Sequence, residues 1–357
     1  MTGRERLLAA CRGERVDATP VWFMRQAGGR LPAYRALRER HSVLEIAKTP
    51  ALAAEVAAGA ADVLGTDGAV LFADIMLLVE ALGIGLDLTE AGPVVERPIR
   101  SAADLRRLRP LDADADLGFV LESIRLVRAS LGERAAIVGI LGGPFTLASY
   151  LVDGAASRDQ IRARILMHAD PGTWHDLLDR LTVASIDYAR AQAAAGADVL
   201  QLFDTWAATL TAFEYEAFVA PYTRRILAAV DVPTVHYVAR SASILAAVAA
   251  TGPTVVALDS RQSLASARDR LGDRQAIQGN LDPALVMAGW RQAADGATAV
   301  LDANAGRPGH VFNVGEAAPR DADPARLRDL VAFVHDRTAA AGAGAGAHTP
   351  EAAHAIA

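Results

Sequence analysis

Arginine, glutamine and glycine residues cluster in one short stretch near the N-terminus, directly after an apolar run. The run 20–24 (PVWFM) is followed by Arg25, Gln26 and two glycines, and then by Arg30 and Arg38. Guanidinium groups bind carboxylates and phosphates through paired N–H donors, and glycines let a loop fold closely around a ligand. The sequence therefore predicts a strand that delivers a cationic loop for binding an anionic ligand.

The elements that must position this loop recur along the whole chain. Short apolar runs alternate with segments of helical period, a pattern typical of a parallel sheet covered by helices. Eight such runs favour an α/β fold with a single (β/α)8 TIM barrel. An open doubly wound sheet would need a Gly-x-Gly-x-x-Gly turn after the first strand, and the sequence has none there. The predicted strands are 20–24, 68–72, 135–140, 197–203, 232–238, 254–258, 274–279 and 308–314, and the main predicted helices are 50–64, 117–131, 173–195, 213–229, 241–250 and 262–271.

Composition limits the class of protein. With 52% hydrophobic and 22% charged residues, the 357-residue chain can bury a large core, and it has no apolar run long enough for a membrane helix. A net charge of −6 argues against a nucleic-acid binder, and the single Cys11 rules out an internal disulfide or a multi-cysteine metal cluster. We expect a cytoplasmic enzyme with one barrel domain over 1–338 and a disordered low-complexity tail over 339–357.

In a barrel of this kind, functional residues lie just past the C-terminal ends of the strands. Polar or small residues follow the predicted strands there, which predicts one cleft at that end. These residues are Arg25, Gln26, Asp74, 142–145 with Tyr150, Asp204, Thr205, His236, Tyr237, Asp259, Ser260, Arg261, Asn280, Asp282, Asn313 and Glu316.

Six motifs at these strand ends, taken together and in order, resemble the uroporphyrinogen decarboxylase family. The resemblance covers residues 4–335, nearly the whole predicted domain. The motifs are 24–28 (MRQAG) followed by Leu31-Pro32, 72–75 (FADI), 142–146 (GGPFT), 150–154 (YLVDG), 200–204 (LQLFD) and 278–283 (QGNLDP).

The resemblance implies a cofactor-free (β/α)8 barrel, usually a homodimer, that converts the four acetate side chains of uroporphyrinogen III to methyl groups in haem biosynthesis. Protonating a pyrrole ring makes a cationic electron sink, so that an adjacent acetate can lose carbon dioxide without a metal or prosthetic group. Such a site needs an anion beside the ring, cations on the carboxylates and a proton source. We therefore expect a small-molecule substrate, no cofactor, and neither nucleic acid nor membrane as a partner.

The resemblance assigns the catalytic centre to three residues. Asp74 matches the carboxylate that accepts hydrogen bonds from the pyrrole N–H groups; alternatively, it caps a helix that begins at Ile75. Arg25 matches the arginine that meets the reacting acetate. Because arginine stays protonated near neutrality, orientation and charge pairing suit it better than proton donation. Tyr150 matches a tyrosine beside that acetate; alternatively, it is a core residue.

Further residues complete the predicted substrate-binding set. Gln26 would donate a hydrogen bond to a carboxylate. Arg38 matches a propionate- or acetate-binding arginine, although its spacing from Arg35 also suits a solvated helix face. The predicted set is Gln26, Arg30, Arg38, Phe72, Thr205 and Glu316.

The departures from the family pattern that alter the charge of the expected cleft fall in two places. Gly29 stands where the family has a second loop arginine, and Arg30 comes one place later, so the loop must bend to bring it round. Glu316, in the run NVGEA, replaces a carboxylate-binding histidine with an anion. Because an unpaired carboxylate in a desolvated cleft costs about 2–5 kcal/mol, compensation by Arg240 or Arg261 would decide how well an octa-anionic substrate binds.

Three functions stay open at this point. The first is uroporphyrinogen decarboxylation, with Arg30 in the bent loop. The second is a paralogous decarboxylase acting on a smaller pyrrole- or indole-type acid. The third is a non-catalytic tetrapyrrole-binding relative, against which the retained Arg25, Asp74 and Tyr150 argue. A zinc methyltransferase of the same superfamily needs thiolate ligands that Cys11 alone cannot supply, so that function is rejected.

Overall fold

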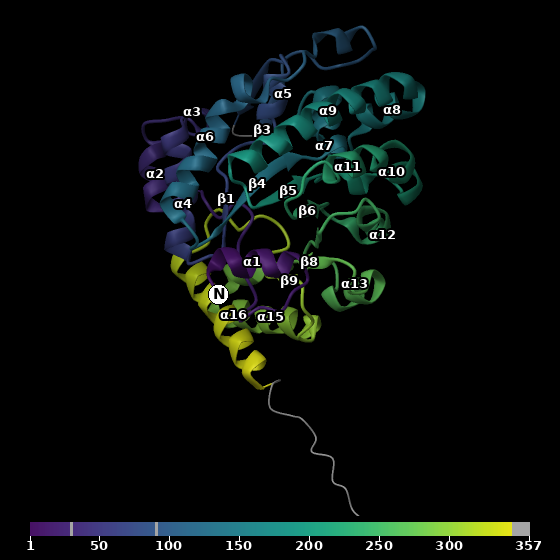
Figure 1. Cartoon of the computed structure of the whole chain (residues 1–357). Coiled ribbons are helices and arrows are strands. Elements are labelled where there is room, and N and C mark those ends of the chain that lie inside the picture. The colour runs from purple at the N-terminus through teal and green to yellow at the C-terminus, as the bar shows by residue number, and fades with distance from the viewer. Residues whose placement is uncertain (29–30, 90–91, 345–357) are drawn as a thin grey trace, which may run out of the picture.

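A curled, parallel seven-stranded sheet runs through the centre of the computed structural model, which describes residues 1–28, 31–89 and 92–344 (Figure 1). The strand order is β1-β4-β5-β6-β7-β8-β9, so strands that follow one another in this sheet are also neighbours in space. Helices cover the outer face of the sheet, as connections between parallel strands require. The strands are β1 (Gly68–Val70), β4 (Ala136–Gly142), β5 (Val199–Phe203), β6 (Thr234–Tyr237), β7 (Val255–Ala257), β8 (Ala276–Gln278) and β9 (His310–Val311).

The segment 20–23 lies between the two edges of this sheet. Val21 forms a single parallel bridge with Phe312, whose N–H donates to the carbonyl of Pro20 (2.8 Å). On the other side, the N–H of Asp67 donates to the carbonyl of Val21 (2.8 Å). The first predicted strand therefore contacts both edges but is not a regular strand. The closed eight-stranded barrel predicted from the sequence appears here as a seven-stranded half-barrel.

The other seven predicted strands are confirmed within a few residues, and alternation along them builds two cores. In β4, Val138 packs into the core inside the curled sheet, whereas Ile137 packs into the core beneath the outer helices. This is the two-residue period of a strand that is buried on both faces. A polar chain crosses the inner core, in which Trp22 Nε1 donates to Gln278 Oε1 (3.1 Å) and Gln278 Nε2 donates to Gln201 Oε1 (3.0 Å).

The predicted helices are also present, with two corrections, one of which is that 241–250 is a 3-10 turn followed by a five-residue helix. Helix α9 begins where Asp170 caps the N–H of Thr173 (3.1 Å) ahead of a first-turn proline. The predicted helix 213–229 is instead two helices, because Val219 has non-helical backbone angles just before Pro221. The helices are α1 (Gly3–Cys11), α2 (Pro32–Arg38), α3 (Val43–Lys48), α4 (Pro50–Leu64), α5 (Leu77–Ala81), α6 (Ala113–Leu131), α7 (Pro144–Asp153), α8 (Ile161–Ala169), α9 (Pro171–Ala195), α10 (Ala212–Phe218), α11 (Ala220–Leu227), α12 (Leu245–Ala249), α13 (Leu264–Leu271), α14 (Pro283–Ala288), α15 (Trp290–Asn304) and α16 (Pro324–Gly344), with 3-10 turns at Asp104–Arg107, Ala207–Thr209 and Ser241–Ser243.

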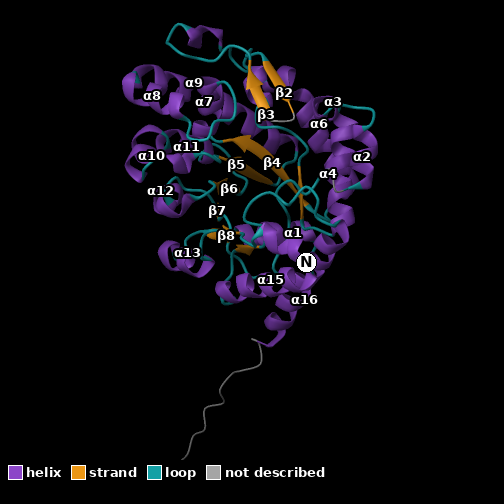
Figure 2. Ribbon diagram, turned by 180° about the vertical axis from the view of Figure 1, so that it is seen from behind, coloured by secondary structure: helices purple, strands orange, loops and turns teal. Residues whose placement is uncertain are grey.

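A hairpin that the sequence analysis missed stands apart from the main sheet (Figure 2). Its strands β2 (Leu86–Thr89) and β3 (Gly92–Val95) pair antiparallel, and Val95 N–H donates to the carbonyl of Gly154 (2.7 Å) at the end of α7. At the C-terminus, α16 continues to Gly344, beyond the predicted domain boundary at 338. Residues 345–357 lie outside the described residues, so the predicted tail stays a prediction. Every helix in the described ranges is too short or too polar to cross a membrane.

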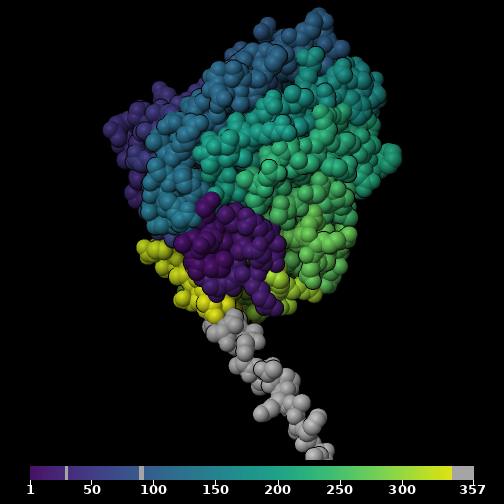
Figure 3. Space-filling view, in the orientation of Figure 1, coloured from purple at the N-terminus to yellow at the C-terminus, as the bar shows by residue number. Residues whose placement is uncertain are grey.

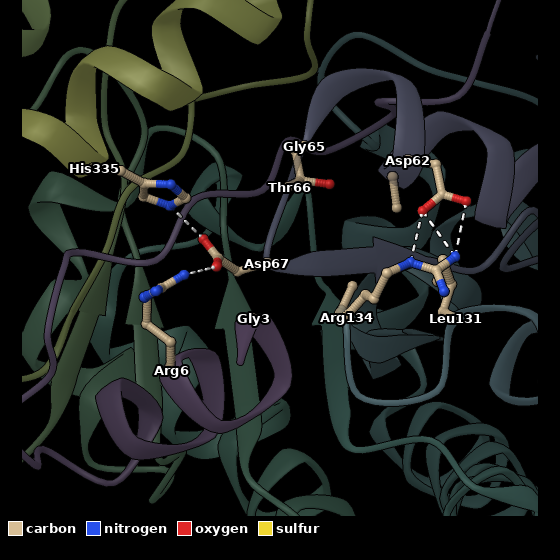
Figure 4. A pocket seen from close by; sticks show the side chains of 11 residues that line it. Gly3, Arg6, Asp62, Gly65, Thr66, Asp67, Leu131, Arg134 and His335 are labelled. Carbon is tan, nitrogen blue, oxygen red and sulfur yellow. Dashed lines mark hydrogen bonds and ion pairs between the residues drawn. The ribbon is translucent and has the colours of Figure 1, made fainter. Parts of the chain in front are cut away.

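The N-terminal end of the sheet is covered by α1, which packs against β1, β4, β8 and β9 beside α16 (Figure 3). A cavity of about 280 Å³ at this end is lined by charged side chains (Figure 4). Asp67 is the central group: Oδ1 accepts from Arg6 Nη1 (2.6 Å), while Oδ2 accepts from Val21 N–H (2.7 Å) and lies 2.8 Å from His335 Nε2. One carboxylate thus ties together α1, the segment 20–23 and α16.

Replacing Asp67 with alanine is expected to lower the free energy of unfolding by about 3–5 kcal/mol. The Asp67 side chain is only 3% exposed, and its loss leaves the buried Val21 N–H without an acceptor and removes one of the two carboxylates that pair with Arg6, the other being Asp17. Asp62→Ala is the matched control, because Asp62 pairs with Arg134 at 48% and 59% side-chain exposure and should cost at most about 1 kcal/mol. Urea denaturation measures both. Equal losses in the two variants would contradict this account.

Candidate functional site

Arg25, Asp74 and Tyr150 influence one another electrostatically at the C-terminal end of the strands. Burial raises the pKa of Asp74, and the Met76 N–H and the charge of Arg25 partly oppose this. Burial also raises the pKa of Tyr150 to about 12, with a further contribution from the negative charge of Asp74 and an opposing one from Arg25. The structure therefore brings together the three residues that the sequence analysis placed in the centre.

Asp74 follows β1 and shapes the turn that leads into α5. Its Oδ1 atom accepts a hydrogen bond from Met76 N–H (2.8 Å), and its carbonyl accepts one from Leu77 N–H (3.2 Å). The helix-capping alternative is not borne out, because α5 begins at Leu77 with Met76 as its N-cap residue and has no side-chain cap. Within the described part of the chain, no donor bonds to Oδ2 of Asp74, so this oxygen can accept a hydrogen bond from a ligand.

Arg25 is the exposed member of an otherwise buried segment, since residues 21–24 and Gln26 are all buried. Its backbone has φ = 57°, a left-handed conformation that a residue with a side chain seldom adopts. The turn is held by a hydrogen bond from the Gln26 N–H to the carbonyl of Phe23 (3.0 Å). Such strain is characteristic of functional sites, where surrounding structure holds a side chain in one orientation.

Tyr150 projects from α7 and packs against aromatic neighbours. Its ring centroid lies 4.4 Å from that of Trp206, with the planes at 43°. Phe72, one of the predicted substrate-binding residues, packs on Tyr34 with centroids 5.4 Å apart. Thr205, beside Trp206, is partly buried in the turn after β5. These aromatic pairs supply flat apolar surface of the kind that heteroaromatic rings pack against.

Two predicted substrate-binding residues, Gln26 and Arg38, do not join this group. Gln26 is fully buried, where its Nε2 donates to the carbonyl of Gly68 (2.9 Å) and its Oε1 accepts from Phe23 N–H (3.2 Å). Its amide therefore links the segment before Arg25 to β1, a positioning role. Arg38 is exposed and donates to the carbonyl of His41, as expected for the solvated helix face. Arg30, like Gly29, lies outside the described residues.

Glu316 is paired with a cation. Its Oε1 accepts hydrogen bonds from Ser260 Oγ (3.0 Å) and from Arg261 Nη1 (3.2 Å). Of the two arginines proposed to compensate it, Arg261 therefore makes the contact, whereas Arg240 shows no bond to Glu316 among the described residues. Burial raises the pKa of Tyr237, the negative charge of Glu316 adds to this, and the charges of Arg261 and Arg25 oppose it.

Asp204 is a fully buried carboxyl group that the sequence analysis placed at a strand end without a role. Its Oδ1 accepts from the N–H (2.8 Å) and the Oγ1 (2.9 Å) of Thr146, which joins the end of β5 to the first turn of α7. Its Oδ2 is buried without a partner among the described residues. Burial raises its pKa to about 6, although the Thr146 donors oppose the shift. Asp204 therefore supports the helix that carries Tyr150.

The raised pKa of Asp204 predicts a pH dependence of stability. The folded protein holds this proton more tightly than the unfolded chain, whose value is 3.8, so the free energy of unfolding falls as pH rises from about 4 to about 6. The loss amounts to about 3 kcal/mol, at about 1.4 kcal/mol per tenfold change in proton affinity. Asp204→Asn removes this titration, so the difference between variant and wild type in urea denaturation should change across this range. A constant difference would contradict the assignment.

His236, placed in the cleft by the sequence analysis, belongs instead to the core. It lies within β6, is fully buried, and has Nδ1 at 3.3 Å from Thr251 Oγ1. Burial lowers its pKa to about 3, so it is neutral at physiological pH. Among the described residues, no group of three or more His, Cys, Asp or Glu side chains is arranged to hold a metal ion.

Comparison with known proteins agrees with these observations. The family model "Uroporphyrinogen decarboxylase (URO-D)" matches residues 2–337. A protein named uroporphyrinogen decarboxylase from Syntrophotalea carbinolica is 46% identical over 92% of this chain and 96% of its own, and one from Trichlorobacter lovleyi is 43% identical over 92% and 98%. A solved structure described as a methyltransferase from Methanosarcina mazei superposes with a TM-score of 0.78, covering 94% of this chain and 99% of its own, at 24% identity, which is a likeness of fold alone. The chain therefore belongs to the uroporphyrinogen decarboxylase family.

Proposed function

We propose that this protein is a carboxy-lyase that removes the acetate carboxyl groups of uroporphyrinogen III, yielding coproporphyrinogen III and carbon dioxide in haem biosynthesis. The observation that supports this most directly is the grouping of Arg25, Asp74 and Tyr150 at the strand ends. The chain that carries them is 46% identical to a protein named uroporphyrinogen decarboxylase. Each step replaces a carboxylate with hydrogen: the C–C bond to the carboxylate breaks, carbon dioxide leaves, and a proton is taken up.

The reaction proceeds through a protonated pyrrole ring. Protonation of the ring makes it an electron acceptor, the bond to the carboxylate breaks, and its electron pair moves into the ring. A proton is then added to the exocyclic carbon, and the ring loses the extra proton to restore the pyrrole. The protein must stabilise the ring cation and supply protons at two positions.

Asp74 stabilises the cation in this scheme. Its Oδ2 accepts hydrogen bonds from the pyrrole N–H groups, and its partly buried position strengthens the attraction between carboxylate and cation. Arg25 pairs with the departing carboxylate and holds it in place. Tyr150, with its pKa raised to about 12, stays protonated at neutral pH, so it can donate a hydrogen bond beside the reacting acetate but gives up its proton poorly.

Several finer features belong to the same proposal. The hydrogen bonds of segment 20–23 to both sheet edges support its role as the eighth strand of a closed (β/α)8 barrel. The family resemblance implies a homodimer and a reaction without cofactor, and the composition of the chain supports a cytoplasmic location. A smaller heteroaryl acid is the second candidate substrate, favoured by the replacement of the family's histidine by Glu316.

Anaerobic incubation with uroporphyrinogen III tests the proposal. Products are oxidised to porphyrins and separated by carboxyl number, and stepwise appearance of species with seven to four carboxyl groups is the expected result. Intact octacarboxylate with a folded protein would refute it. Turnover of a pyrrole- or indole-acetate under the same conditions would then support the second candidate.

A further inference from the structure

Two loops, one after β7 and one after β9, meet through three polar side chains. Glu316 Oε1 receives hydrogen bonds from Ser260 and Arg261, whereas Glu316 Oε2 is buried and has no hydrogen-bond partner in the described ranges. The Glu316 side chain is 26% exposed and that of Arg261 is 59% exposed. The carboxylate is therefore the inner member of the pair, and the guanidinium is the member that a ligand can reach.

Backbone packing fixes the position of this pair. A Cβ atom at Gly315 would lie 2.1 Å from the backbone nitrogen of Ser260, so only glycine lets the two loops approach this closely. The Gly315 N–H also donates to the carbonyl of Leu281 (2.8 Å). In the β7 loop, the Arg261 N–H donates to Oδ1 of the fully buried Asp259 (2.9 Å). Arg261 is thus attached to a rigid turn, unlike an ordinary surface arginine.

The pair also lies within electrostatic reach of the catalytic centre. Tyr237, at the end of β6 and 5% exposed, responds to the charges of Glu316, Arg261 and Arg25. A guanidinium has five N–H donors in a planar fork, and the one hydrogen bond from the Arg261 side chain to described residues uses Nη1. The remaining donors can bind a carboxylate of a ligand while Nη1 still donates to Glu316.

We propose that Arg261 binds a peripheral carboxylate of the substrate, on a pyrrole ring other than the one at Arg25, and that Glu316 is the positioning residue that holds it. This inference rests on the proposed function and adds a specificity-determining residue to it. It also explains how Glu316, an anion, can stand in a cleft that binds an octa-anionic ligand. The guanidinium of Arg261 lies between Glu316 and the incoming carboxylate, and its positive charge offsets the repulsion between the two anions.

Steady-state kinetics on uroporphyrinogen III test the inference. Arg261→Gln should raise KM about 10-fold and change kcat by less than about 2-fold, because peripheral binding is the same in ground and transition states. Arg261→Lys should recover part of this loss, since lysine keeps the charge but not the planar fork. Arg274→Gln is the matched control: it makes the same charge change at an exposed residue before β8, at the opposite end of the strands, and should leave KM unchanged.

A double-variant comparison tests the role of Glu316. Glu316→Gln alone should raise KM about 3-fold and should add nothing in the Arg261→Gln background, because Glu316 acts through Arg261. An unchanged KM in Arg261→Gln, or effects of the two substitutions that multiply in full, would overturn the inference.

A binding measurement separates failure of this inference from failure of the proposed function. If the wild-type protein does not turn over uroporphyrinogen III, the proposed function fails, and the dissociation constant of oxidised uroporphyrin III is then measured by fluorescence at low and high salt. Weaker binding and a smaller salt dependence in Arg261→Gln than in Arg274→Gln support the carboxylate site. Equal binding by these two variants, or no binding by the wild type, rejects it.

Discussion

Asp74→Asn is expected to reduce kcat for decarboxylation by about 100- to 1000-fold while leaving the fold intact. Asparagine has nearly the same shape and still offers Oδ1 to the Met76 N–H, so the turn before α5 is preserved. It cannot supply the negative charge that stabilises the protonated pyrrole. Single-turnover kinetics under anaerobic conditions measure the loss, and circular dichroism checks the fold.

The pH profile gives an independent measurement on the same residue. The pKa of Asp74 is raised by burial, and the reaction requires the ionised carboxylate, so kcat should fall as pH drops through a value above the usual range of an aspartate.

Asp114→Asn is the control for Asp74→Asn, because it removes an exposed carboxylate on α6. Asp74→Asn with wild-type kcat, or a loss of equal size in Asp114→Asn, would refute the assigned role.

Arg25→Gln is expected to lower kcat/KM by about 30-fold to several thousand-fold, the equivalent of the 2–5 kcal/mol that an unpaired carboxylate costs in a desolvated site. Glutamine keeps much of the length of the side chain but leaves the reacting acetate without its cation. The effect should appear in both kcat and KM, because the guanidinium orients the carboxylate as well as binding it.

Arg25→Lys separates charge from geometry. Lysine keeps the charge but loses the planar fork, so activity should recover only in part. Both variants must adopt the left-handed backbone at φ = 57°, which makes any cost of that conformation common to them. If Arg25→Lys and Arg25→Gln were equally active, charge pairing with the acetate would be disproved.

The strand pattern was readable from the sequence because near-continuous apolar runs, repeated at regular spacing between helical segments, are typical of parallel strands buried on both faces. The exception is the run 20–24, which is as apolar as the others. Its ladder is interrupted because the Val21 N–H donates to the side chain of Asp67 instead of to a neighbouring strand. The hairpin β2–β3 was missed because its strands are short and largely outside the core.

The site was only partly predictable, because local hydrogen bonds also decide where its side chains point. Arg25 and Asp74 closely follow predicted strands, and in a barrel-like sheet the residues after the strands lie at the same edge. Gln26 is adjacent to Arg25, yet the turn at 23–26 points its amide to the backbone of Gly68. Neighbours in sequence therefore have opposite roles, and this depends on a turn whose geometry the residue types do not specify.

The sequence by itself determined the parallel α/β architecture, because this depends on the periodicity of apolar residues, and the resemblance of its motifs to a known family indicated the type of reaction. Only the tertiary structure decided how the departures from the family pattern are accommodated. Arg261 and Glu316 are 55 positions apart, and they pair because the loop at Gly315 packs against the backbone of Ser260. Such a contact follows from the packing of two loops, so it could not be predicted from the identity of either residue.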